Sequence, residues 1–181
     1  MQAILPTINH LLALGIVLLQ VGILITLYFF FFKKESKWLH IVSAYALYIG
    51  LLVSLASILL SLFYSNIVGY APCTLCWWQR VFMYPQLLFF GVALYKKKEK
   101  ILRYALIFSI IGIILSVYHY YIELGGSEII PCGTTVSCAR RYIFEFGYIT
   151  IPLMAFTGFA AIITALFTRK ALQNKASLEK N

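Results

Sequence analysis

Residues 73–100 read CTLCWWQRVFMYPQLLFFGVALYKKKEK, with two cysteines before an apolar run and a cluster of lysines after it. At about 1.5 Å per residue, the apolar run, about Trp77–Tyr95, is only just long enough to cross a hydrocarbon core of roughly 30 Å. Lysines that follow a membrane span are typical of its cytoplasmic end. The stretch therefore predicts a membrane helix with its cysteines at the outer end.

The whole chain has the composition of a membrane protein. Of its 181 residues, 62% are hydrophobic and only 12% are charged, and the mean hydropathy is +0.88. Soluble domains of this size are less apolar, and a transmembrane β-barrel would show alternating strands instead of long apolar runs. The net charge of +9 lies mostly at the ends of the apolar segments. It therefore indicates membrane topology and not nucleic-acid binding.

Five apolar segments are long enough to span a membrane, so we expect an all-α membrane protein. Spans two to five should form an antiparallel four-helix bundle over about residues 39–168, with span one as an extra N-terminal helix. The chain would then be a single integral membrane domain, residues 1–181, surrounded by lipid. Span one is too long for the apolar region of a signal peptide, so we expect it to be retained. The predicted spans are about Ile8–Phe32, Leu39–Phe63, Trp77–Tyr95, Ile101–Tyr121 and Tyr148–Phe167.

The charged residues predict the orientation of the chain. All but three of the 15 Lys and Arg residues lie in segment 33–37, in segment 96–103 or in the C-terminal tail. Because basic residues concentrate on the cytoplasmic side of a membrane, these segments should lie inside. The N-terminus and both cysteine segments should then lie outside and the C-terminus inside, which agrees with an odd number of spans.

Small residues predict which helix faces pack together. In spans two, four and five they recur at four-three-four spacing, which forms one stripe per helix where neighbours can approach closely. Span one has only Gly15 and Gly22, so we expect it to pack at the periphery. The three stripes are Gly50, Ser54, Ser57 and Ser61; Ala105, Ser109, Gly112 and Ser116; and Thr157, Ala161, Thr164 and Thr168.

The four cysteines form two close pairs, Cys73 with Cys76 and Cys132 with Cys138. A zinc site of four thiolates is disfavoured, because loops outside the cytoplasm are oxidising and favour disulfides, and we expect no metal. A c-type haem site would need His where Trp77 stands. A disulfide across two intervening residues adds little stability, because the loop that it closes is tiny. The spacing therefore favours redox chemistry, with purely structural disulfides as the alternative.

The first pair is placed where a thiolate is stabilised. The third span should begin just after Pro72, so that helix N-terminal amides face the cysteines. Arg80 lies four residues beyond Cys76 and shares its helix face. Arg80 could hold a thiolate or the oxyanion of a reduced cofactor, and the alternative is an interfacial arginine that extends to the membrane surface.

The second pair lies in a polar, glycine-containing segment, about Ile122–Gly147. Exchange with an external thiol requires access to the disulfide. We therefore expect Cys132 and Cys138 to meet a soluble partner, while Cys73 and Cys76 lie at the membrane surface.

Together these motifs resemble the DsbB family of quinone-dependent thiol oxidases. The resemblance rests on Cys-x-x-Cys-x-x-x-Arg over residues 73–80, on the later outer cysteine pair and on the basic turn between the intervening spans. The spacing of Cys132 and Cys138 is most similar to the short-loop, BdbC-like branch of Gram-positive bacteria. The likeness covers about residues 39–168. The vitamin K epoxide reductase family has its cysteine pairs in the opposite order.

The resemblance implies an electron path and a place in the bacterial cytoplasmic membrane, with the cysteines on its extracytoplasmic face. A thioredoxin-like partner of the DsbA or BdbD type would form a mixed disulfide with Cys132, and Cys138 would then exchange with Cys73. Cys76 would be the thiolate that reduces a bound quinone, either ubiquinone or menaquinone, with Arg80 stabilising the charge. The protein would thus be an enzyme that reoxidises its partner.

Some features stay open at this point. Span one is extra to the four-helix family pattern, and Gln79 stands where the best-known member has Glu, so it receives no catalytic role. His119 is either a quinone-proximal histidine or an interfacial one, and Trp77 either covers a quinone ring or belongs to an aromatic belt. Two other functions remain as rivals. One is a binding or assembly protein with structural disulfides, and the other is a reductase that runs the relay backwards, which the lack of a cytoplasmic-side cysteine disfavours.

Overall fold

The computed structural model describes residues 4–33, 36–129, 132 and 136–178, and in them it is all-helical apart from one isolated bridge between Glu145 and Ile149. This confirms the all-α part of the predicted fold class. Lys34 and Lys180, which contribute to the predicted basic segments, lie outside the described residues. The long helices are α1 (Leu5–Phe32), α2 (Lys37–Leu62), α3 (Thr74–Lys96), α4 (Leu102–Glu123) and α5 (Ile151–Leu178), with a π-turn η1 (Phe63–Ile67) after α2 and a 3-10 turn η2 (Glu99–Ile101) before α4.

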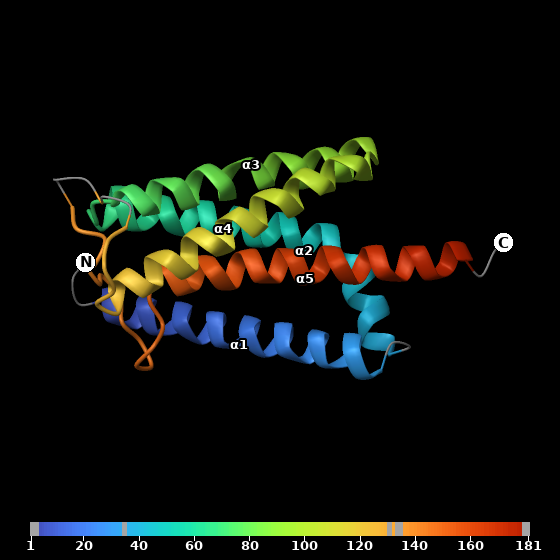
Figure 1. Ribbon diagram of the computed structural model, residues 1–181, viewed down its shortest axis with the longest axis horizontal. Helices are drawn as coiled ribbons and strands as arrows, with labels where there is room; N and C mark the ends of the chain where they lie inside the picture. Colours follow the sequence, from blue (N-terminus) through green and yellow to red (C-terminus); the bar gives the residue numbers. More distant parts are fainter. Residues whose placement is uncertain (1–3, 34–35, 130–131, 133–135, 179–181) are drawn as a thin grey trace.

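The helices lie along one long axis, and consecutive helices run in opposite directions (Figure 1). Helices α2, α3, α4 and α5 form a ring in which each packs mainly against two neighbours, and α1 packs outside the ring against α5 and α2. The start of α1 and the described residues between α4 and α5 lie at one end of the bundle, and the end of α5 lies at the other (Figure 1). This is the bundle with a peripheral first helix that the sequence predicts.

Within the part of the chain that the structure describes, four helical segments are long and apolar enough to cross a membrane: α1, α2 with η1, η2 with α4, and α5. The chain is therefore a multi-pass membrane protein. Helix α3 is not among them, because its 23 residues include Gln79, Arg80 and Gln86. The count of five spans stays a prediction.

The sequence predicts the start of α3 well but not the end of α5. Helix α3 begins at Thr74, directly after its N-cap Cys73, as expected from Pro72. Helix α5 runs on to Leu178, well past the predicted end near Phe167. No Gly or Pro interrupts residues 167–178, and such residues are what ends a helix.

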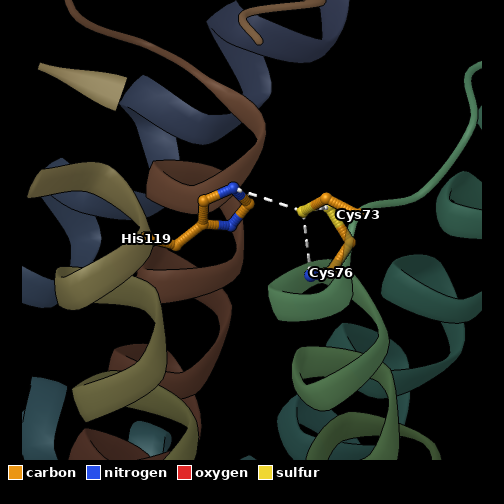
Figure 2. Close-up of side chains that lie close together, drawn as sticks. All are labelled: Cys73, Cys76 and His119. Carbon is orange, nitrogen blue, oxygen red and sulfur yellow. Dashed lines mark hydrogen bonds between the residues drawn. The ribbon is translucent and has the colours of Figure 1, made fainter. Parts of the chain in front are cut away.

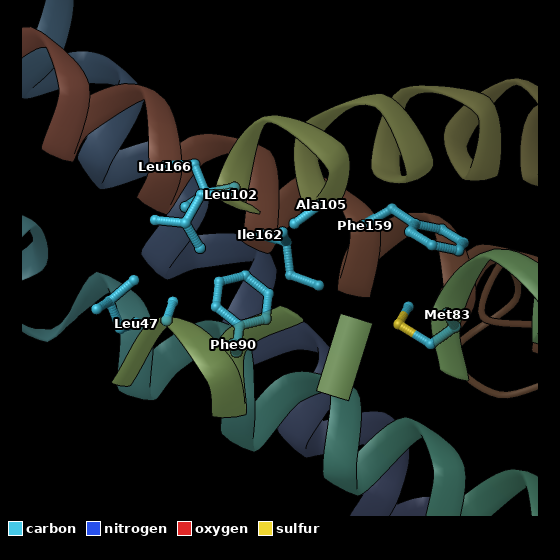
Figure 3. Packing of buried hydrophobic residues seen from close by; sticks show 9 residues of the cluster. Leu47, Met83, Phe90, Leu102, Ala105, Phe159, Ile162 and Leu166 are labelled. Atoms are coloured by element: carbon cyan, nitrogen blue, oxygen red, sulfur yellow. The ribbon is translucent and has the colours of Figure 1, made fainter. Parts of the chain in front are cut away.

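The small-residue stripes lie in the core, but they accommodate aromatic rings instead of neighbouring backbones. A Cβ atom on Gly50 would lie 2.2 Å from Cζ of Phe90, and one on Gly112 would lie 2.3 Å from Cζ of Phe159. Both rings are fully buried, and Figure 3 shows them within one apolar cluster with Ile162. The glycines therefore fix how closely α2 meets α3 and α4 meets α5.

Candidate functional site

The first cysteine pair forms the N-terminus of α3. The Sγ atom of Cys73 accepts a hydrogen bond from the backbone amide of Cys76 at 3.3 Å, which makes Cys73 a side-chain cap of the helix. The two Sγ atoms lie 3.0 Å apart, and both cysteines are free thiols (Figure 2). Helix N-terminal amides carry partial positive charge, so this position favours a thiolate.

In the Cys73–Cys76 pair, the negative charge of a thiolate is more stable on Cys73 than on Cys76. Its hydrogen bond with the Cys76 side chain lowers the pKa of Cys73 to about 4, and the hydrogen bond with His119 acts in the same direction, while burial opposes both. The resemblance assigned the stable thiolate to Cys76. In the reduced pair, Cys73 is the sulfur that is ionised first. The role of Cys76 as the thiolate that reduces a quinone stays a prediction.

His119 on α4 connects the cysteine pair to the loop. Its Nε2 atom lies 3.6 Å from Sγ of Cys73 (Figure 2), and the same atom lies 3.2 Å from the carbonyl oxygen of Cys138. The amide nitrogen of Gln79 lies 3.5 Å from Nδ1 of His119 and donates to Ser116 Oγ at 3.3 Å. Because an amide nitrogen only donates, Nδ1 accepts and Nε2 carries the proton. That proton points at the Cys73 sulfur and the Cys138 carbonyl.

The second cysteine pair is a disulfide that is buried against the first. Cys132 and Cys138 are bonded, with their Cα atoms 5.8 Å apart, and they are only 8% and 1% exposed. They share one buried cluster with Cys73, Leu75 and Ile122. The expectation that this pair is open to an external thiol is therefore wrong for this conformation. The two pairs that the sequence places in separate segments are brought together.

Contacts of Arg141 and Tyr142 also hold the loop in this position. The Arg141 guanidinium donates to the carbonyl oxygen of Glu123 at the end of α4, from Nε at 2.9 Å and also from Nη2. The hydroxyl of Tyr142 donates to the carbonyl oxygen of Ala71, just before the first cysteine pair. The loop is thus tied to both helices whose ends it covers.

Arg80 contacts α2 and does not reach the membrane surface as a free charge. Its Nε atom donates to Ser61 Oγ at 2.7 Å, and its Nη2 atom donates to the Ser61 carbonyl at 3.2 Å. The guanidinium also lies 5.0 Å from the ring centroid of Trp77, a distance at which a cation is attracted to the ring face. Arg80 is therefore fixed one turn below Cys76.

A cavity of about 350 Å³ lies below the first cysteine pair, between α1, α2, α3 and α5. Of the residues predicted to hold a quinone, Cys76 and Arg80 line it. Trp77 and His119 are not among the lining residues, since Trp77 is 56% exposed and His119 contacts Cys73. The other lining residues include Leu11, Leu12, Gly15, Ile16, Ser57, Ser61, Met83, Met154 and Phe159.

Three stacked tyrosines also line the cavity, and sequence reasoning gave none of them a role in the site. The ring of Tyr70 lies 5.7 Å from that of Tyr64 and 4.4 Å from that of Tyr142, with both pairs nearly parallel. They come from η1, the segment before α3 and the loop. Their spacing in the sequence gives no signal of the stack, because it depends on how the loop folds back.

The first pair and His119 could also be considered as metal ligands. The ligand atoms of Cys73, Cys76 and His119 all lie within 4.8 Å of one another. Structural zinc takes four ligands, and the other two cysteines are bonded to each other. The arrangement suits thiol exchange between two adjacent pairs better than a closed metal site.

The fold and the site together define a multi-pass helical membrane protein with a dithiol and a disulfide in contact at one end. A family model described as "Disulfide bond formation protein DsbB" matches residues 43–176. The chain belongs to the DsbB family, and it is therefore a membrane disulfide oxidoreductase. The family match leaves α1 outside.

Named relatives agree with this assignment. The chain is 38% identical over 136 residues to "Probable disulfide formation protein C 2" of Bacillus anthracis, which covers 75% of this chain and 97% of that protein. It is 41% identical over 119 residues to "Disulfide bond formation protein C" of Bacillus subtilis, with coverage of 65% and 86%. It is also 35% identical over 133 residues to "Probable disulfide formation protein" of Chlamydia pneumoniae, with coverage of 73% and 96%. No solved structure matches the chain.

Proposed function

We propose that the protein reoxidises a thioredoxin-like dithiol oxidase of the DsbA or BdbD type and passes the electrons to a membrane quinone, either ubiquinone or menaquinone. The observation that carries this proposal is the position of Cys76. It belongs to the cluster of the two cysteine pairs and also lines the cavity that extends below them. A single sulfur thus connects the thiol chemistry at the outer end with an apolar site in the bundle.

The proposed thiol relay begins at the loop disulfide. The partner's thiolate attacks Cys132, the partner is released as a disulfide, and the two electrons remain on Cys132 and Cys138 as thiols. Cys138 then attacks Cys73 of an oxidised Cys73–Cys76 pair, and Cys132 resolves the interloop disulfide. Two electrons and two protons leave the partner dithiol and arrive at Cys73 and Cys76.

His119 and Gln79 support the exchange between the pairs. The Nε2 proton of His119 is shared between Cys73 Sγ and the Cys138 carbonyl, so it stabilises negative charge on Cys73 and holds the Cys138 backbone beside it. Gln79 keeps this proton on Nε2 through its contact with Nδ1. We assign His119 and Gln79 to the thiol exchange. His119 is not among the residues that line the cavity, whereas Gln79 contacts His119 and also lines the cavity.

The cavity fits a quinone in size and chemistry. Its volume of about 350 Å³ falls within the range of about 300–1,000 Å³ for small-molecule sites, which are mostly apolar with a few polar groups. Leu12, Met83 and Phe159 would contact the ring, and Arg80 would stabilise negative charge on a ring oxygen. When bound, a quinone supplies an acceptor for two electrons and two protons and leaves as quinol.

The same assignment places the cysteines on the extracytoplasmic side of the bacterial cytoplasmic membrane. The start of α1 and the described cysteines lie at one end of the bundle (Figure 1), and the sequence puts most Lys and Arg residues at the opposite end. This follows the positive-inside rule. An oxidising compartment on the cysteine side also suits a protein that makes disulfides.

The test is anaerobic mixing of the purified protein with a quinone and a reduced thioredoxin-like partner, with quinol formation followed optically. We expect stoichiometric quinol, none with Cys76→Ser, and a sharp decrease with Arg80→Ala. A protein whose disulfide the partner cannot reduce, and which forms no quinol, would be the binding or assembly protein with structural bridges. Reduction of oxidised partner by quinol under the same conditions would instead support the reductase.

A further inference from the structure

We propose that α1, the helix outside the family match, forms one wall of the quinone site and contributes directly to quinone binding. This inference rests on the proposed function and deepens it. The ligand is the same membrane quinone, and the residues that contact it on this side are Leu11, Leu12, Gly15 and Ile16. In this chain the site would therefore need a fifth helix, because four helices alone would leave it open on this side.

The four α1 residues form a single patch that faces the redox residues. Their spacing of one, three and four positions places them on adjacent rows of one helix face. Across the cavity lie Cys76 and Arg80 of α3. A ring between them would contact α1 on one side and the cysteine helix on the other.

Polar contacts fix α1 in register against the bundle. The Tyr64 hydroxyl, which belongs to a cavity-lining residue, donates to Oδ1 of Asn9 at 2.7 Å. Lower on α1, Gln20 donates to Thr157 Oγ1 at 3.1 Å and accepts from the Tyr148 hydroxyl at 3.0 Å. Isolated polar side chains in an apolar helix are costly unless they are paired. These pairs therefore keep the α1 patch in one position instead of leaving it to slide against α5.

Gly15 is the residue of the α1 wall that has no side chain. A Cβ atom on Gly15 would meet no atom within 4 Å, although Gly15 lines the cavity. Gly15 is exposed as well as lining the cavity, so the open space in front of it adjoins the cavity, and a planar ring can approach the α1 backbone there. Gly22, two turns further along α1, is also free of neighbours within 4 Å but is not among the lining residues.

This pair of glycines provides a matched test. Gly15→Leu should place a side chain in the cavity, while Gly22→Leu makes the same change on the same helix outside it. For Gly15→Leu we expect the dissociation constant of a short-chain ubiquinone or of menadione, measured by equilibrium binding in detergent, to rise at least tenfold. The KM for the same quinone should rise in parallel. Gly22→Leu should stay within twofold of the unmodified protein in both measurements.

A second readout separates quinone binding from folding and from thiol exchange. Without quinone, one equivalent of reduced partner should still reduce Gly15→Leu at the unmodified rate, which requires an intact cysteine cluster. Unchanged quinone affinity in Gly15→Leu, or equal losses in both glycine variants, would overturn the role of α1. If the unmodified protein reduces no quinone at all, the proposed function fails first, and the two failures are thus distinguishable.

Photocrosslinking tests the wall without any substitution. A short-chain azidoquinone bound to the unmodified protein and irradiated should label the peptide that contains residues 11–16, and excess unlabelled quinone should suppress this label. Labelling confined to α2, α3 and α5 would contradict the proposal, even if Gly15→Leu failed to fold.

Discussion

Nε2 of His119 lies 3.6 Å from Sγ of Cys73, and the same nitrogen lies 3.2 Å from the carbonyl oxygen of Cys138. One proton thus contacts a sulfur of the first pair and the backbone of the second. Thiol–disulfide exchange is faster when the leaving sulfur is a stable thiolate. His119 therefore stands where it can favour transfer from the loop pair to the helix pair.

The first prediction concerns the ionisation of Cys73. Since hydrogen bonds lower its pKa to about 4, the thiolate is present above that pH and is lost as the pH falls through it. The rate at which Cys73 of the reduced protein is alkylated should then stay nearly constant from neutral pH down to near pH 4. His119→Ala should raise the pKa of Cys73, so that the alkylation rate begins to fall at a higher pH.

The control for this experiment is His40→Ala. His40 is an exposed histidine of α2, so the pH profile should not change. The measurement is the rate of iodoacetamide modification of Cys73, resolved by peptide mass spectrometry across a pH series. An identical profile for His119→Ala would mean that Cys76 stabilises the Cys73 thiolate without His119.

The second prediction concerns Gln79, which is buried and contacts His119 Nδ1 and Ser116 Oγ. Gln79→Leu removes the group that keeps the histidine proton on Nε2. A hydrogen bond to a charged group is worth about 1.5–3 kcal/mol, so exchange between the two cysteine pairs should slow by about tenfold or more. The measurement is the rapid-quench rate at which electrons from reduced partner appear on Cys73 and Cys76.

Gln86→Leu is the matched control. Gln86 is also buried on α3 but accepts from Ser109 and donates to the Phe82 carbonyl, away from the cysteines. This variant should lower stability and leave the exchange rate nearly unchanged. Equal slowing in both variants would show that any buried amide of α3 acts only through the fold.

The sequence predicted the features that local chemistry determines. The start of α3 followed from Pro72, and the contact faces of α2, α4 and α5 followed from small residues at helical spacing. Both depend on residues within a few turns of one another. The family resemblance rested on the same short motifs and is confirmed.

The sequence could not predict contacts between distant segments. Helix α1 is apolar except for a few scattered polar residues, so the sequence did not show which of its faces points inward. Asn9 of α1 meets Tyr64 only in the folded chain. Gln79 and His119 come from different helices, and neither carries a local signal of the other. The loop composition suggested an open segment, but Arg141 and Tyr142 tie it down and bury Cys132 and Cys138.

The third prediction tests how closely the Phe90 ring packs against Gly50. In Gly50→Ala the new Cβ atom would lie 2.2 Å from the buried Phe90 ring, and overpacking of this kind costs about 1–3 kcal/mol. Gly91→Ala, on α3, meets no atom within 4 Å and should be neutral or stabilising by up to about 1 kcal/mol, because Ala favours helix. Thermal unfolding in detergent measures both. If Phe90→Leu restores part of the stability of Gly50→Ala, the ring contact is the cause.

The fourth prediction concerns access to the loop disulfide. Arg141 holds the loop to the end of α4 through the Glu123 carbonyl, so Arg141→Ala should open the loop and expose Cys132 and Cys138 more often. Their reduction by a small external thiol should become several-fold faster, because attack on a buried disulfide requires opening. Arg140→Ala is the matched control, because Arg140 contacts the Tyr142 ring face and does not bond α4. The measurement is the rate of thiol release with dithiothreitol. Equal acceleration in both variants would attribute the effect to lost charge, and no acceleration in either would mean that Tyr142 and the buried cluster hold the loop without Arg141.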